Sequence, residues 1–337
     1  MRSPSRAPPP LIAALGAGRM GRGIAHTFAY AGLEVLLIDA KARDAAATQK
    51  LRNEAMAEID AGLQVLARME VFDDALRPAM LARIRFVSCD QAPAALARAD
   101  VVFEGVPEVL EAKREALGFA SAHMRADAIL ASTTSTMLST ELARMVTAPE
   151  RFLNAHWLNP AYLVPLVEVS PHAGTVPAVI DRLKVLLEKI GKKPVLCKAT
   201  PGYIVPRFQV LFMNEAARMI EEGIATAEDI DRAILNGFGF RYATMGVVDF
   251  IDYGGLDILY HASRYMAAAT GEERFAAPAI VNRYMQEGRV GLKSGQGFKD
   301  YRDIDVAAYR EKVQQRQVGM LKQLGLIPRP GAALEGA

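Results

Sequence analysis

The chain has 337 residues, of which 51% are apolar and 23% charged, and its formal net charge at pH 7 is +2. This composition is ordinary for a globular protein and gives no sign of a nucleic-acid binder or a membrane protein, whose apolar segments would be far longer. A chain of this length is long enough for two domains, each with a core of its own.

The first residues and the cysteines bear on the cellular setting. MRSPSRAPPP is basic and proline-rich, and the apolar segment behind it stops at Gly16, before it could serve as a secretory signal. We therefore expect residues 1–9 to form a disordered tail. Cys89 and Cys197 are too few for a disulfide framework and lack the partners of a zinc site. A reducing, cytoplasmic setting and a site without a metal are the simpler interpretation.

The segment from Leu11 to Ala40 contains an apolar run, the glycines Gly16, Gly18 and Gly21, a helical pattern and a second apolar run that ends at Asp39. Three glycines alone would also fit a plain turn. A strand before them, a helix through them and an acid after the next strand together form a dinucleotide-binding pattern. Here Gly16 permits the tight turn, Gly18 lets the backbone approach a pyrophosphate, and Gly21 lets the helix pack on the strand.

The acid at the end of the second strand predicts which dinucleotide is bound. A carboxylate at Asp39 would accept hydrogen bonds from an adenosine ribose and repel a 2′-phosphate, so we expect NAD rather than NADP. Lys41 and Arg43 follow directly, and their charges can weaken this preference. We also expect Arg19 and Met20, inside the glycine-rich loop, to contact the cofactor.

Strands and helices then alternate. A helix-rich stretch follows from Lys41 to about Ala82, and strand-like runs recur at IRFVS, DVVFEGV and AILAS with helical segments between them. This alternation is typical of a parallel sheet with right-handed crossovers. KKPVLCKA is the last strand-like run of this kind.

The second half of the chain has a helical pattern almost throughout, including TAEDIDRAI with Thr226 as its cap and a charged stretch from Ile304 to Leu324. The predicted fold class is therefore α/β, with an N-terminal Rossmann-type doubly wound sheet followed by an all-α C-terminal domain. We expect the first domain to span 10–199, the second 200–325, and a flexible tail to follow at 326–337. TPGYIVPRF would form the crossing, with Pro206 near the first helical turn.

A histidine and a glutamate are the candidate chemical groups. Ligands in such sheets bind beyond the carboxyl ends of the strands. His156 and Glu168 each lie inside a strand-like run, with NPAY as a turn between the runs. Adjacent strands can bring the two side chains into hydrogen-bond reach, so that the carboxylate fixes the ring tautomer and favours the imidazolium. From the spacing alone, a core histidine and a surface acid explain the pair at least as well.

Many motifs resemble, in order and spacing, the L-3-hydroxyacyl-CoA dehydrogenase family. They are GAGRMGRGIA with Asp39, STTST, HWLNP, LVEV, TPGYIV, NEAARMIEEG, AEDID and GLKSGQGF, from about residue 11 to 301. That family includes 3-hydroxybutyryl-CoA dehydrogenase, and also gulonate dehydrogenase (lambda-crystallin), carnitine dehydrogenase and a pyridine-carboxylate dehydrogenase, which act on free acids. The resemblance implies a homodimer and, as in fatty acid metabolism, NAD-dependent oxidation of the 3-hydroxyl of a short-chain L-3-hydroxyacyl-CoA.

The resemblance also implies roles for single residues. His156 would take the hydroxyl proton, and Glu168 would orient and stabilise that histidine. Ser135 falls on the family's substrate-contacting serine, although it also suits a helix cap before MLSTEL. Asn159, in HWLNP, falls on an asparagine of the same site.

Two charged residues match positions that line the cofactor in relatives, namely Glu108 and Lys113. The surrounding sequence, VPEVLEAKREA, would equally suit an ordinary helix start with solvated charges.

Three departures from the family pattern bear on the substrate. The family's PGFIVNR is replaced by PGYIVPR, so Pro206 stands where an asparagine contacts the substrate, and a donor and an acceptor are lost. Counting forward from Asp39, the serine and lysine that hold CoA in short-chain relatives fall on Ala55 and Gly62. GFGFRYATMG resembles the free-acid branch, and its Arg241 can pair a substrate carboxylate or be an ordinary exposed or interface arginine.

These departures leave the thioester narrowly ahead of a free hydroxy-carboxylic acid such as gulonate, carnitine or an aromatic hydroxy acid. A second alternative is an NAD-binding structural protein without turnover, because a fold does not by itself give a function. The presence of Ser135, His156 and Glu168 argues against that alternative.

Overall fold

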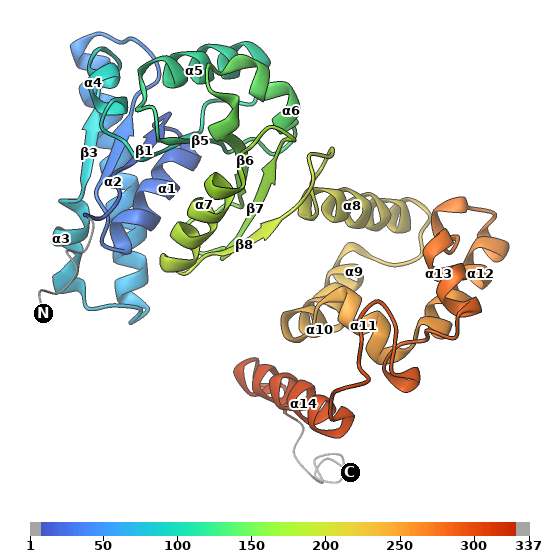
Figure 1. Ribbon diagram of the computed structural model, residues 1–337. Helices are drawn as coiled ribbons and strands as arrows, with labels where there is room; N and C mark the ends of the chain where they lie inside the picture. The colour runs from blue at the N-terminus through green and yellow to red at the C-terminus, as the bar shows by residue number, and fades with distance from the viewer. Residues whose placement is uncertain (1–7, 328–337) are drawn as a thin grey trace, which may run out of the picture. The chain divides into compact units, whose positions relative to one another are not determined.

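The structure, a computed structural model, describes residues 8–327. The expected tails, 1–9 and 326–337, therefore lie almost wholly outside the described residues. The chain forms two compact units that divide between Met213 and Asn214, inside helix α8 (Val205–Glu221). The first unit carries the sheet and the second is helical (Figure 1). The predicted boundary between residues 199 and 200 stays a prediction.

The first unit is built on one eight-stranded sheet with the order β3-β2-β1-β4-β5-β6-β7-β8. Neighbouring strands are parallel except for β6 and β7, which are antiparallel. The strands are β1 (Ile12–Leu15), β2 (Val35–Ile38), β3 (Ile84–Val87), β4 (Val101–Glu104), β5 (Ile129–Ser132), β6 (Phe152–Trp157), β7 (Leu166–Pro171) and β8 (Lys193–Leu196).

Helices cover both faces of this sheet. Alternate side chains of each strand belong to different faces, and Ile12 and Ala14 of β1 join one apolar core while Ala13 and Leu15 join the other. The first core includes α1 (Arg19–Tyr30), α2 (Ala45–Arg68), α3 (Arg77–Leu81) and α7 (Pro177–Lys189); the second includes α4 (Ala92–Leu96), α5 (Leu110–His123) and α6 (Ser139–Leu142). The predicted doubly wound sheet is confirmed.

The second unit is made of helices joined by short turns. After α8 come α9 (Ala227–Ala233), a π-helical turn (Ile234–Gly239), α10 (Phe240–Thr244), α11 (Val247–Gly254), α12 (Leu256–Thr270), α13 (Ala279–Gln286) and α14 (Val306–Gln323). The Thr226 side chain accepts a hydrogen bond from the Asp229 amide at the start of α9, which confirms its predicted cap. The helical C-terminal domain is therefore confirmed as well.

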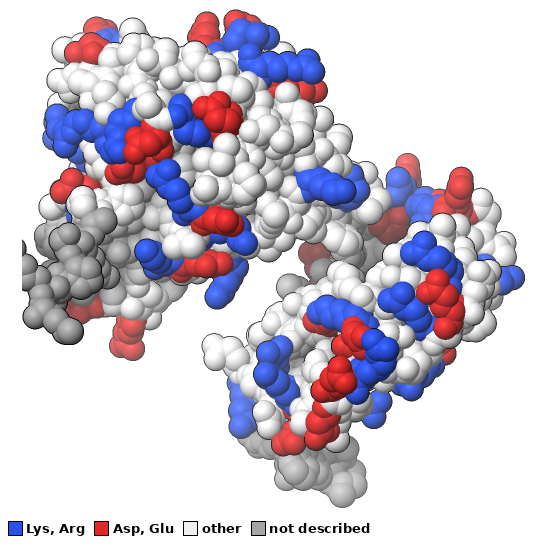
Figure 2. Space-filling view, viewed as in Figure 1, with Lys and Arg blue, Asp and Glu red and all other residues white. Residues whose placement is uncertain are grey.

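The surface of the two units is mixed in charge, with acidic and basic side chains interspersed on the face shown in Figure 2. Helix α8 has no fully buried residue, and large apolar side chains such as Val210, Leu211 and Met213 are exposed on it. Within residues 8–327, no helix is both long and apolar enough to cross a membrane.

Candidate active site

The loop between β1 and α1 can accept a dinucleotide phosphate. Gly16 has a positive φ of 110°, and a Cβ at Gly21 would lie 1.9 Å from the Gly16 carbonyl oxygen, so only glycine fits there. Gly18, the N-cap of α1, has open space around its Cα, and no side chain caps the helix. The free amides of this helix terminus therefore face a space that an anionic group can enter. These residues fit NAD.

Asp39 stands at the end of β2 and is only 3% exposed. Its Oδ1 accepts the Lys41 amide at 3.1 Å, and its Oδ2 accepts Arg43 Nε at 2.7 Å. The carboxylate is thus held in place by its own chain, while it also lines the cavity described next.

One cavity of about 600 Å³ joins this loop to the carboxyl ends of the neighbouring strands. It brings together most of the residues that the sequence singled out. They are Gly16, Gly18, Arg19, Met20, Asp39, Glu108, Lys113, Ser135 and His156. The cavity therefore contains both the predicted cofactor residues and the predicted base.

His156 and Glu168 face each other across the antiparallel pair β6 and β7, whose register places them directly opposite. His156 Nδ1 lies 2.8 Å from Glu168 Oε2. The other carboxylate oxygen, Oε1, accepts the amides of Ile204 and Val205 at 2.9 and 2.8 Å. All of the carboxylate is buried, and its partners fix its orientation.

The surroundings of Glu168 favour its ionised form. Burial alone would raise the pKa of this carboxyl, but the hydrogen bonds from His156 and from the amides of Val205 and Ile204 together hold the pKa below its usual value. A carboxylate at this place assigns the proton to Nδ1 of His156, which leaves Nε2 as the ring nitrogen able to accept a proton.

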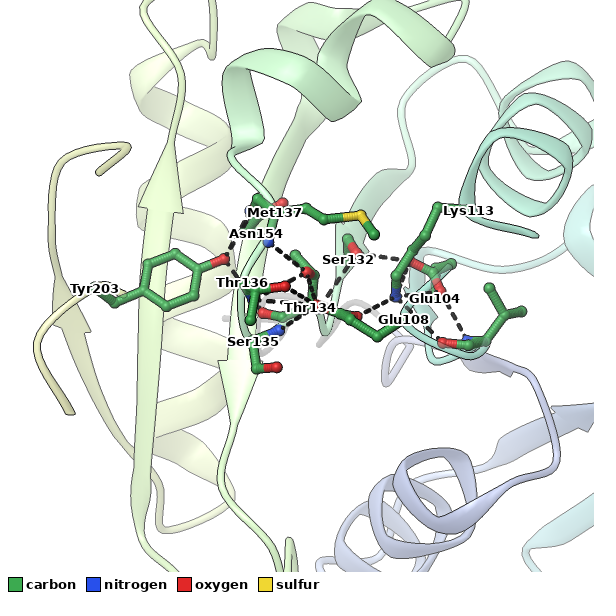
Figure 3. Close-up of polar contacts among 11 residues, drawn as sticks. Glu104, Glu108, Lys113, Ser132, Thr134, Ser135, Thr136, Met137, Asn154 and Tyr203 are labelled. Atoms are coloured by element: carbon green, nitrogen blue, oxygen red, sulfur yellow. Dashed lines mark hydrogen bonds and ion pairs between the residues drawn. The ribbon is translucent and has the colours of Figure 1, made fainter. Parts of the chain in front are cut away.

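The loop that follows β5 is fixed by Glu108. Glu108 Oε1 accepts hydrogen bonds from the amides of Ser135 and Thr136 at 3.0 and 3.1 Å and from the hydroxyls of Thr134 and Thr136 (Figure 3). The Ser135 hydroxyl lies outside this network and has no intramolecular partner among residues 8–327. Ser135 is not the cap of α6, whose N-cap is Leu138. Its hydroxyl is free to meet a ligand.

Behind Glu108, a lysine is enclosed by acids. Lys113 is 1% exposed, and its Nζ lies 3.0 Å from Glu104 Oε1 and 3.3 Å from Glu108 Oε2. Ser132 Oγ donates to the other oxygen of Glu104 at 2.6 Å. The alternative of solvated charges is therefore wrong for Lys113, which is part of a buried ionic network that supports the Ser135 loop.

The remaining predicted residues are more dispersed. Asn159 lines a smaller cavity of about 80 Å³ beside Arg19. Pro206 is the second residue of α8, near the first helical turn as predicted. Arg241 belongs to the second unit, where its guanidinium lies 4.2 Å above the centre of the Phe250 ring. Substrate contacts of these three residues stay predictions.

Two side chains near the site, Tyr203 and Lys192, were not singled out by the sequence analysis. Tyr203 places its hydroxyl against the Ser135 loop, where it accepts Asn154 Nδ2 at 2.8 Å. Lys192 donates to the carbonyls of Ala161 and Val164 at 2.5 and 2.8 Å, so it holds the loop between β6 and β7. Their partners are remote in sequence, and no spacing rule could have paired them.

The family of the chain follows from comparison with known proteins. Residues 11–200 match the NAD binding domain of 3-hydroxyacyl-CoA dehydrogenase, and residues 202–301 match its C-terminal domain. The chain belongs to the 3-hydroxyacyl-CoA dehydrogenase family. It is therefore an NAD-dependent dehydrogenase that acts on a CH–OH group, and the predicted cofactor, NAD, is confirmed.

The relatives of this dehydrogenase differ in substrate. A 5-formyl-3-hydroxy-2-methylpyridine 4-carboxylate 5-dehydrogenase of Mesorhizobium japonicum is 29% identical over 93% of this chain and 97% of its own. A 3-hydroxybutyryl-CoA dehydrogenase of Bradyrhizobium diazoefficiens is 31% identical over 86% of this chain and 95% of its own. The crystal structure of a 3-hydroxyacyl-CoA dehydrogenase from Archaeoglobus fulgidus matches with a TM-score of 0.74 and 32% identity, and the match covers 95% of this chain and all of the other.

Proposed function

We propose that this dehydrogenase oxidises the secondary 3-hydroxyl of a short-chain L-3-hydroxyacyl-CoA to the 3-keto product, with His156 as the general base. The observation that carries the proposal is the 2.8 Å hydrogen bond between His156 Nδ1 and the buried Glu168, which leaves Nε2 as the ring nitrogen able to accept a proton, on a histidine that lines the cavity. Bound NAD supplies the acceptor for the hydride that leaves the hydroxyl-bearing carbon.

The chain's own residues handle the proton. The substrate hydroxyl gives its proton to His156 Nε2, and the ring becomes an imidazolium. Glu168 stays ionised, stabilises the positive ring and keeps Nδ1 protonated throughout. Ser135, whose hydroxyl has no other partner among residues 8–327, contacts the substrate, and Asn159, Pro206 and Arg241 are further candidate contacts.

The cofactor contacts form a separate part of the proposal. The amides beside Gly18 hold the pyrophosphate and Asp39 the adenosine ribose. Arg19 and Met20 line the same cavity, as do Glu108 and Lys113. Because Lys113 is enclosed by acids, it contributes through the placement of Glu108 more than by direct contact.

A free hydroxy-carboxylic acid is the second candidate substrate, and the packing of α2 favours it. Ala55, where short-chain relatives hold CoA with a serine, is fully buried in the core. A Cβ at Gly62, the position of their lysine, would lie 3.2 Å from the His26 ring. Arg22 also pairs with Glu58 on this helix. By this count, neither position offers a group to a CoA phosphate.

The reaction is tested with His156→Ala. Purified protein with NAD and L-3-hydroxybutyryl-CoA should generate NADH absorbance, and the variant should lose roughly 10²- to 10⁴-fold in kcat, the usual contribution of a general base. His123→Ala, on the exposed end of α5, is the matched control and should keep full activity. A His156→Ala enzyme with wild-type kcat would refute the role of the base. A wild type that binds NAD but turns over no hydroxy substrate would instead favour the NAD-binding protein without turnover.

The substrate class is tested in parallel with L-gulonate, carnitine and free 3-hydroxy acids. Turnover of the thioester supports the first candidate. Turnover of free acids alone, abolished by Arg241→Ala, would replace it with the second. Pro206→Asn, which restores the family's side chain, should raise activity on the thioester if the lost asparagine limits it.

A homodimer and a cytoplasmic location are also part of the proposal. The exposed apolar side chains of α8, among them Leu211 and Met213, support a dimer because burying them would remove apolar surface from water. Leu211→Asp should convert a dimer, measured by sedimentation, into a monomer.

The free thiols Cys89 and Cys197 support a reducing compartment.

A further inference from the structure

Tyr203 lies in the crossing between β8 and α8, in the segment PGYIVPR. The side chain is 4% exposed. Its backbone has a positive φ of 42°, which is uncommon for a residue with a bulky side chain and persists only where the surroundings enforce it. The hydroxyl of this residue is therefore buried at a place where the backbone itself is tightly constrained.

The hydroxyl of Tyr203 is directed at the loop that carries Ser135. It accepts Asn154 Nδ2 at 2.8 Å, and it lies 3.2 Å from the Thr134 carbonyl oxygen and 3.3 Å from that of Met137, to which it can donate (Figure 3). These two carbonyls flank Ser135 on both sides. Burial raises the pKa of Tyr203, so the hydroxyl keeps its proton and remains a donor.

The ring of Tyr203 meets the other half of the site. It lies nearly parallel to the His156 ring, with 5.4 Å between the centroids and 21° between the planes. The next two amides of the segment, those of Ile204 and Val205, are the ones that hold Glu168. One short segment therefore contacts His156 with a ring, Glu168 with its backbone and the Ser135 loop with a hydroxyl.

We propose that Tyr203 is a positioning residue that fixes the Ser135 loop relative to the His156 ring. The inference rests on the proposed function, in which Ser135 contacts the substrate and His156 takes its proton. One bound substrate must contact the Ser135 hydroxyl and the His156 ring at the same time. A displacement of about 1 Å between reacting groups can lower the rate about 100-fold. Glu108 fixes the loop from one side, and the Tyr203 hydroxyl fixes it from the other.

A merely structural role would have a different signature. Loss of a buried tyrosine hydroxyl lowers stability anywhere in a protein, because the groups it paired are left without a partner. Only a positioning role also lowers kcat in enzyme that is still folded. A second buried tyrosine makes this comparison possible, since Tyr301 in the second unit is 6% exposed and its hydroxyl bonds to Asp252 at 3.0 Å.

The experiment compares Tyr203→Phe with Tyr301→Phe in the full-length protein, with kcat and KM measured at a temperature where circular dichroism shows both to be folded. Tyr203→Phe removes only the hydroxyl and keeps the buried ring, so this variant should fold. We expect Tyr203→Phe to lower kcat about tenfold, a change of about 1.4 kcal/mol in the activation free energy, with KM changed less than about threefold. Tyr301→Phe should leave kcat within about twofold of wild type.

A double-mutant cycle with Ser135→Ala tests whether the Tyr203 hydroxyl affects kcat through the Ser135 loop. If the Tyr203 hydroxyl acts through the Ser135 loop, adding Tyr203→Phe to Ser135→Ala should lower kcat by less than about twofold more. Additive losses, an unchanged kcat in Tyr203→Phe, or an equal loss in Tyr301→Phe would each overturn the inference. Failure of the proposed function is visible separately, because His156→Ala would then retain activity whatever the outcome of this cycle.

Discussion

Glu168 in the first unit and Asp252 in the second are both fully buried carboxylates that accept two backbone amides. The remaining hydrogen bond distinguishes them. Glu168 bonds to His156, which lines a cavity, whereas Asp252 bonds to Tyr301, which is itself buried. Under the proposed function, a buried carboxylate thus serves proton transfer in the first unit, whereas in the second unit a similar carboxylate holds a loop in place.

The loop around Asp252 explains a motif of the family resemblance, GLKSGQGF. A Cβ at Gly297 would lie 2.1 Å from Asp252 Oδ1, and a Cβ at Gly291 would lie 2.3 Å from the Asp252 carbonyl oxygen. The glycines allow the chain to wrap around the carboxylate, whose amide donors are Phe298 and Lys299. This motif therefore stabilises the second unit, while HWLNP and LVEV supply the candidate chemistry of the first.

The largest expected effect is on the first carboxylate. Glu168→Gln should lower kcat about 10³-fold, or about 4 kcal/mol in activation free energy, because a neutral amide neither stabilises the imidazolium nor fixes the Nδ1 proton. Its Oε1 can still accept the two amides, so the melting temperature should change little. Glu188→Gln, on the exposed side of α7, removes a charge without this geometry and should be neutral. A Glu168→Gln enzyme that is unstable but fully active would make Glu168 an anchor like Asp252.

The second carboxylate should show the opposite pattern. The Asp252 carboxylate accepts hydrogen bonds from two backbone amides and the Tyr301 hydroxyl. Asp252→Asn replaces one of its oxygens with an NH₂ group, which cannot accept these bonds, so the free energy of unfolding should fall by about 3 kcal/mol. Urea denaturation measures this loss, and exposed Asp303→Asn is the control. Affinity for NAD, titrated with the folded variant, should change less than twofold, because the cofactor loop belongs to the first unit. A large loss of NAD affinity at full stability would contradict the division of roles.

The sequence predicted the parts of the site that depend on local pattern. The glycine spacing and Asp39 follow one strand and one helix. The spacing of His156 and Glu168 allowed a pairing across adjacent strands but fitted a core histidine and a surface acid at least as well, so the prediction of the pair rested on the family resemblance. The structure places the two residues opposite each other. The sequence did not predict that Glu104, Lys113 and Glu108 form a buried ionic network, because charged residues at the start of a helix are usually solvated. The contacts of Tyr203 were not predicted either, because its partners lie up to 69 residues away in the sequence. Long-range side-chain pairing has no periodic signature.

The first unit should lose stability in acid because it buries a histidine. His26 on α1 is 2% exposed, and burial, aided by the nearby charge of Lys192, lowers its pKa to about 4. A folded-state pKa below the unfolded value of about 6.5 means that the unfolded chain binds the proton first. The contribution of His26 to stability is thus present above pH 6.5 and is lost as the pH falls toward 4.

His26→Phe isolates that contribution. Between pH 7 and pH 4.5 the wild type should lose about 2 to 3 kcal/mol of unfolding free energy that the variant keeps. The comparison uses the difference between two pH values, so any pH-independent effect of the phenylalanine cancels. Equal pH dependence in both proteins would mean that His26 is protonated in the folded state or exposed on opening of α1.

A third carboxylate, Asp39, shares one feature with each of the other two, and its substitution has the smallest expected effect. Like Asp252 it is held by its own chain, through the Lys41 amide and Arg43, and like Glu168 it lines the cavity. Asp39→Ser should raise the ratio of kcat/KM for NADP to that for NAD about tenfold, because the repulsion of a 2′-phosphate disappears and Arg43 is released. The double variant Asp39→Ser with Arg43→Met also lacks the released Arg43 cation, so its ratio of kcat/KM for NADP to that for NAD should fall most of the way back to the wild-type ratio. If the double variant keeps the whole gain, Arg43 takes no part in cofactor choice, and Asp39 excludes NADP by its charge alone.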